Sequence, residues 1–172
     1  MPSEPAPVMQ PASRPLIAGA VDVRVTERGN PARWWRAAMA HNRRELAVMY
    51  QVADANPWQN GQAQFTHAFI GGDAVDLQLD VPGRGPIRLL AANVGGENTA
   101  VYWQSQADKE ENATTYMVAN NPANAVTFPV VKRLPNATVK VATGFNAYTV
   151  LVTVPLADLG LDTALGKEIK GV

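Results

Sequence analysis

A strict alternation of apolar and polar side chains between residues 74 and 81 constrains the fold of this chain more than any other feature. One face of an extended strand carries only apolar side chains, namely Val75, Leu77, Leu79 and Val81. The opposite face carries Ala74, Asp76, Gln78 and Asp80. Because successive side chains of a strand point to opposite faces, this pattern predicts a strand with one buried face.

The same period recurs along the chain. Two apolar runs at residues 34–40 and 46–52 flank a polar turn and predict a β-hairpin. Other expected strands lie at residues 17–26, 87–94, 99–104, 126–130, 139–141 and 148–154. The segments 54–64 and 107–124 are polar and are expected to be loops.

A short helical turn is expected from Pro155 to Gly160, since proline suits the first helical position and glycine the residue after the last. With about eight strands and no long amphipathic helix, the chain is expected to be all-β. The predicted fold is a two-sheet antiparallel β-sandwich of the immunoglobulin-like or jelly-roll-like kind, with that one helical turn.

Composition narrows the classes of protein. The 172 residues suffice for one domain, expected at 17–172, after a disordered Pro-, Ala- and Ser-rich leader or linker at 1–16. Fifteen basic and fifteen acidic residues balance, so no general attraction to nucleic acid is expected. No segment approaches the roughly 20 apolar residues of a bilayer-spanning helix, so no membrane insertion is expected. The absence of cysteine excludes disulfides, thiolate zinc sites and cysteine nucleophiles.

Four motifs in order then resemble the family 9 carbohydrate-binding modules and the related DOMON-like sandwich domains. They are residues 50–54 (YQVAD), 72–79 with its partner strand 85–90 (GDAVDLQL, GPIRLL), 148–150 (YTV) and 154–161 (VPLADLGL). The resemblance covers residues 32 to 172. Family members usually continue with a further strand, so we expect a fragment that lacks its last strand or strands.

The resemblance implies a non-catalytic module that recognises a glycan or polysaccharide, within a larger extracytoplasmic (periplasmic or secreted) bacterial protein with other domains. Sugar recognition needs an exposed aromatic face and short polar side chains. Trp58 has both in its loop, and we expect it to pair with Trp103. The expected ligand-binding set is Trp58, Trp103, Tyr102, Asn56, Gln59 and Asn60. Because Tyr102 and Trp103 are adjacent, one is expected in the core and the other outward.

Three alternatives stay open. Asp54 and Asp73 could hold calcium, which prefers carboxylate oxygens, or Asp73 could cap its own turn. Some relatives of this sandwich bind a b-type haem for electron transfer, and Met49 and His67 are the available pair of axial ligands. A structural spacer or protein-interaction domain is the third alternative. An accessible Trp58 beside Trp103 favours sugar binding, whereas burial of both favours the spacer.

Catalysis is not expected. The chain has two histidines and shows no nucleophile elbow, HExxH, phosphate-binding or dinucleotide-binding motif. Asp73 and Asp76 are three apart on a predicted strand and so fall on opposite faces, which does not suit an acid–base pair.

Overall fold

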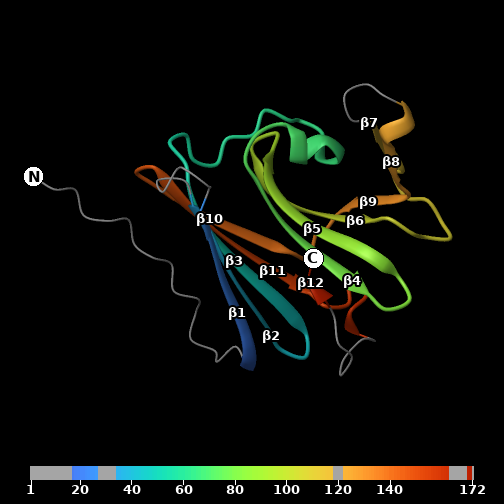
Figure 1. The fold of residues 1–172 in the computed structure, drawn as a ribbon, viewed down its shortest axis with the longest axis horizontal. Helices are drawn as coiled ribbons and strands as arrows, with labels where there is room; N and C mark the ends of the chain where they lie inside the picture. Colours follow the sequence, from blue (N-terminus) through green and yellow to red (C-terminus); the bar gives the residue numbers. More distant parts are fainter. Residues whose placement is uncertain (1–16, 27–33, 118–121, 163–169, 172) are drawn as a thin grey trace, which may run out of the picture.

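Two five-stranded antiparallel sheets pack face to face in the computed structural model, which describes residues 17–26, 34–117, 122–162 and 170–171 (Figure 1). The first sheet has the order β1 (Ile17–Thr26), β2 (Trp34–His41), β3 (Glu45–Ala53), β11 (Ala147–Pro155) and β10 (Thr138–Gly144). The second has the order β12 (Lys170–Gly171), β4 (Ala74–Val81), β5 (Gly85–Val94), β6 (Glu97–Gln104) and β9 (Val130–Arg133). The predicted all-β sandwich is confirmed.

Two smaller parts lie outside these sheets. A hairpin of β7 (Thr114–Met117) and β8 (Ala125–Phe128) forms its own two-stranded sheet, with the 3-10 turn η3 (Pro122–Asn124) before β8. The 3-10 helix η1 (Phe65–Ile70) precedes β4. The predicted leader at residues 1–16 lies outside the described residues, and the predicted loss of a final strand stays a prediction.

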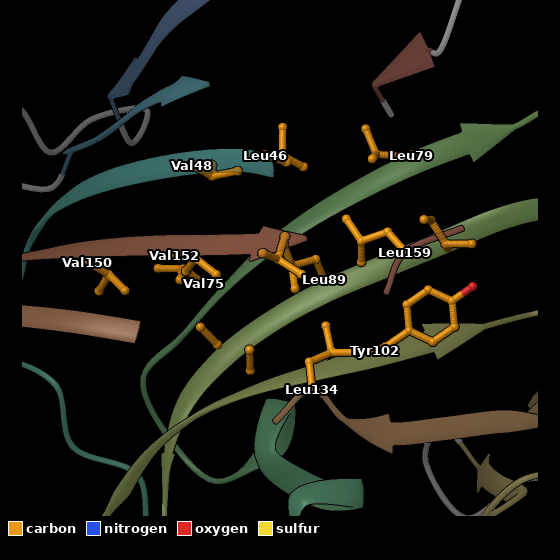
Figure 2. Packing of buried hydrophobic residues seen from close by; sticks show 14 of the residues in the cluster. Leu46, Val48, Val75, Leu79, Leu89, Tyr102, Leu134, Val150, Val152 and Leu159 are labelled. Carbon is orange, nitrogen blue, oxygen red and sulfur yellow. The ribbon is translucent and has the colours of Figure 1, made fainter. Parts of the chain in front are cut away.

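The main core fills the space between the sheets, as the alternation predicts. Strands β3 and β11 direct the residues at every second position inward, and β4, β5 and β6 meet them from the other sheet (Figure 2). The labelled members are Leu46, Val48, Val75, Leu79, Leu89, Tyr102, Leu134, Val150, Val152 and Leu159. Removal of this apolar surface from water is the main stabilising contribution in a domain of this size.

A second core lies on the outer face of the second sheet. Its buried members are Ala68, Leu90, Ala92, Val94, Val101, Trp103 and Val131. Phe65 and Phe69 of η1 and Tyr116 and Phe128 of the β7–β8 hairpin pack against it. The second sheet therefore has a hydrophobic cluster against each of its faces, whereas the first packs against the main core on one face.

The helical turn after β11 closes as expected. The amides of Asp158 and Leu159 donate to the carbonyls of Pro155 and Leu156, at 3.1 and 3.2 Å. Gly160 has a φ of 65°, and the Leu161 amide returns to the Leu156 carbonyl at 2.8 Å. A left-handed glycine followed by this back-bond is a common way for a helical turn to end.

Candidate functional site

The loop after β3 carries most of the predicted ligand-binding residues, and Trp58 is its anchor. The Trp58 side chain is only 8% exposed, and its ring centroid lies 5.4 Å from that of Tyr148. Its indole nitrogen donates to Asn98 Oδ1 at 2.7 Å. The expected exposed sugar platform at Trp58 is therefore corrected, because the ring is part of the main core.

The polar side chains of this loop divide into two kinds. The side chain of Asn60 is fully engaged in hydrogen bonds within the protein. Its Nδ2 donates to the carbonyls of Ala68 (2.7 Å) and Asp73 (3.1 Å), and its Oδ1 accepts from the Gln62 amide (3.0 Å). Asn56 and Gln59 are exposed. Their backbone amides donate to Asp54 Oδ1 and Asp73 Oδ2, and the Gln59 carbonyl accepts from the Asp73 amide at 2.7 Å. Of the predicted amides, Asn56 and Gln59 keep side chains available to a ligand.

Asp54 and Asp73, the predicted calcium pair, do come together. Burial and then the negative charge of Asp54 raise the pKa of Asp73, against the lowering effect of hydrogen bonds from the Gln59 and Trp58 amides. Those bonds tie Asp73 to residues 58 and 59 of the loop after β3, so the expected cap of its own turn is corrected to a link between two separate segments. Within the described part of the chain, no group of three or more His, Cys, Asp or Glu side chains could hold a metal ion.

Tyr102 and Trp103 point to opposite faces of β6, as expected, yet both are buried. Tyr102 lies in the main core and donates its hydroxyl to Gln104 Oε1 at 2.9 Å. Trp103 is fully buried in the second core. The expectation of one outward ring is corrected, because η1 and the β7–β8 hairpin cover the outer face. Trp58 and Trp103 lie in different cores and do not form a clamp.

The predicted haem ligands lie on opposite sides of the sandwich. Met49 alternates with the inward Val48 and Tyr50 and so faces outward from the first sheet. His67 belongs to η1, over the outer face of the second sheet, with its ring centroid 5.7 Å from that of Tyr116. Both sheets separate these two side chains, so they cannot ligate one iron in this arrangement.

An exposed aromatic surface lies instead at one end of the first sheet. Phe145, in the turn between β10 and β11, is 91% exposed, and Trp35 at the start of β2 is 41% exposed. Trp35 lies opposite Val52 in the sheet, and the Asp54 amide donates to the Asn146 carbonyl at 3.0 Å. The start of β2, the end of β3 and the β10–β11 turn therefore all lie at this end of the sheet, and β3 separates the β2 strand of Trp35 from β11.

Sequence reasoning did not select Phe145 as a site residue. The signal was the Gly144-Phe145-Asn146 turn, since an aromatic ring at the tip of a tight turn has little core to pack against. Asn146 has a φ of 56°, a left-handed conformation that asparagine tolerates better than most residues.

Comparisons with protein families, with curated proteins and with solved structures found no match for this chain. The resemblance to family 9 carbohydrate-binding modules therefore remains an expectation from the sequence motifs. In the part of the chain that the structure describes, no helix is long and apolar enough to cross a bilayer.

Proposed function

We propose that this domain is a non-catalytic module that binds a glycan at the end of the first sheet where Phe145 and Trp35 are exposed. The observation that carries the proposal is the near-complete exposure of Phe145 on a turn that is hydrogen-bonded to the loop after β3. An aromatic side chain in this position already presents its apolar face to solvent, so a ligand contacts it without any rearrangement of the protein.

Asp54 connects the aromatic and the polar parts of this surface. Its backbone amide binds the Asn146 carbonyl at 3.0 Å, and its Oδ1 accepts from the Asn56 amide at 2.7 Å. The two bonds hold the Phe145 turn and the exposed Asn56 to the same residue. A pyranose has an apolar C–H face and a rim of hydroxyls. The Phe145 ring suits the apolar face, and the Asn56 side-chain amide suits the hydroxyls. Location outside the cytoplasm, within a longer protein, remains part of the proposal.

A glycan array followed by calorimetry tests the proposal. Phe145→Ala and Asn56→Ala should each weaken binding of any glycan found, with the larger loss at Phe145. Met117→Ala is the matched control, because Met117 is also an exposed apolar residue but lies on the β7–β8 hairpin. Unchanged affinity in Phe145→Ala would place the glycan elsewhere and refute this site.

A structural or protein-interaction domain is the second candidate. The burial of both Trp58 and Trp103 favours it, because the two tryptophans stabilise cores and leave no platform. A folded sample that binds no glycan on the array would support this alternative over glycan binding.

A further inference from the structure

We propose a second site, for a small uncharged polyol or sugar ring, under the β7–β8 hairpin on the outer face of the second sheet. Three buried polar side-chain atoms of the described residues have no hydrogen-bond partner: Asp76 Oδ1, Trp103 Nε1 and the Tyr116 hydroxyl. Leaving such a buried atom unpaired destabilises the folded protein. A ligand that pairs with them would offset that destabilisation.

The three residues belong to one continuous group of contacts. The rings of Trp103 and Tyr116 lie 5.6 Å apart, and both contact Phe69, at 5.5 and 4.6 Å. The Arg88 guanidinium lies 5.7 Å from the Phe69 ring centroid and binds Asp76 Oδ2 at 2.6 Å. Arg88 and Trp103 are direct partners across β5 and β6, so they share the outer face.

The hairpin borders this group through Tyr116, and its Val126 lies partly exposed beside it. Tyr116 and Val126 are opposite each other in β7 and β8, so both point to the face of the hairpin that packs on the sheet. Tyr116 contacts Phe69 and Trp103, yet Val126 is 49% exposed. The face of the hairpin that packs on the sheet is therefore more accessible to solvent at Val126 than at Tyr116. Ile70, at the end of η1, is exposed as well.

The chemistry of the unpaired atoms defines the ligand. Trp103 Nε1 only donates a hydrogen bond, the carboxylate oxygen of Asp76 beside Arg88 accepts, and the Tyr116 hydroxyl does either. Burial raises the pKa of Tyr116, which keeps that hydroxyl neutral. A ligand hydroxyl both accepts and donates, and so satisfies all three kinds of atom. Because the charges of Asp76 and Arg88 already balance, an uncharged ligand fits better than an ion.

This site is separate from the proposed glycan surface at Phe145, which lies on the other sheet. The test is a ¹H–¹⁵N NMR titration that follows the four tryptophan indole signals with glucose, glycerol and acetamide as probes. We expect glucose or glycerol to shift the Trp103 signal saturably. Tyr116→Phe should abolish that shift, whereas Phe145→Ala and Met117→Ala should keep it. Trp103→Phe assigns the signal.

Two results would overturn the proposal. One is the absence of a saturable Trp103 shift with either polyol, including the case in which acetamide alone gives a shift. The other comes from thermal unfolding of Tyr116→Phe. This variant removes only the unpaired hydroxyl and should be at least as stable as the wild type without ligand. A clear fall in its Tm would mean that the hydroxyl already has a partner within the protein.

Discussion

The indole nitrogen of Trp58 lies 2.7 Å from the side-chain oxygen of Asn98, a hydrogen bond that ties the loop after β3 to the start of β6. Trp58 has a φ of 59°, which is uncommon for a residue with a bulky side chain. The ring also contacts Tyr148 of β11. Trp58 thus joins the two sheets at one end of the core, and its backbone conformation is held by contacts on both sides.

Removal of this hydrogen bond should destabilise the domain. Asn98→Ala leaves the mostly buried indole N–H without its acceptor, and we expect a loss of about 1–3 kcal/mol in the free energy of unfolding. Chemical denaturation of Asn98→Ala, Trp58→Phe and the double variant measures the coupling. Because each single variant already removes the bond, the double variant should lose less than the sum of the two. Strict additivity would mean that the bond contributes nothing.

The pair of Asp54 and Asp73 should make stability depend on pH. The pKa of Asp73 is raised in the folded state, by burial first and then by the charge of Asp54. A raised pKa in the folded state means that folding favours the protonated form of Asp73. The stability that Asp73 contributes is therefore fully present below the ordinary aspartate pKa, and it is lost as pH rises through the folded-state pKa. At pH 7, Asp73→Asn should therefore unfold at a slightly higher temperature than the wild type.

Acid and salt provide the controls for that variant. The advantage of Asp73→Asn should shrink at low pH, where the wild-type carboxyl is protonated, and in high salt, which screens partly exposed charges. A wild type that is more stable than Asp73→Asn at pH 7 would contradict the expected repulsion. If calcium raises the Tm of the wild type but not of the variant, the pair is a cation site as the sequence suggested.

The alternation in the sequence was enough to predict most of the strands and the main core. The single strand expected at residues 126–130 is instead two short strands, β8 and β9, which belong to different sheets. Val75, Leu79 and Val81 are buried between the sheets because a period of two leaves an extended chain few other ways to hide them. The two-residue alternation does not predict what covers the outer face of the second sheet. Trp103 was expected to be either core or surface, and only the packing of Phe69 and Phe128 from distant segments decides that it is buried.

Two covering segments escaped prediction because their local signals are weak. η1 is a 3-10 helix of six residues, too short for a helical period, and β7 is a four-residue strand inside a polar segment. Tyr116 is held by its contacts with other rings rather than by a strong local preference. The expected exposure of Trp58 was wrong for the same reason, since the burial of its ring depends on its partners Tyr148 and Asn98.

Gly72 should be far less tolerant of substitution than Gly83. Both have positive φ values, 141° and 81°, which are strained for a residue with a Cβ, at a cost of about 1–3 kcal/mol. At Gly72 a Cβ would also overlap the carbonyl oxygen of Gln59, whereas at Gly83 it would meet no atom within 4 Å. Thermal unfolding should therefore show a larger loss for Gly72→Ala than for Gly83→Ala. Equal losses would show that the loop at Gln59 moves aside freely.

The ion pair of Arg88 and Asp76 should contribute more to stability than the pair of Arg133 and Glu97. Arg88 donates to Asp76 Oδ2 through Nε at 3.0 Å and Nη2 at 2.6 Å, and both side chains are mostly buried. The Arg133–Glu97 distance is 3.5 Å, and both side chains are largely exposed.

Each arginine also lies over a phenylalanine ring, Phe69 for Arg88 and Phe65 for Arg133, at 5.7 and 5.4 Å. Because both arginines make this ring contact, Arg133→Gln controls for the loss of the cation–π interaction in Arg88→Gln. Arg88→Gln should cost about 1.5–3 kcal/mol, the range for hydrogen bonds to charged groups. It removes the positive charge beside the mostly buried Asp76 carboxylate and leaves Oδ2 with the neutral Gln78 Nε2 donor at 3.1 Å. Arg133→Gln should cost less than about 1 kcal/mol. Urea denaturation of the two variants compares these losses directly, and a loss at Arg133 equal to that at Arg88 would mean that the ring contacts, rather than the Asp76 pair, carry the stability.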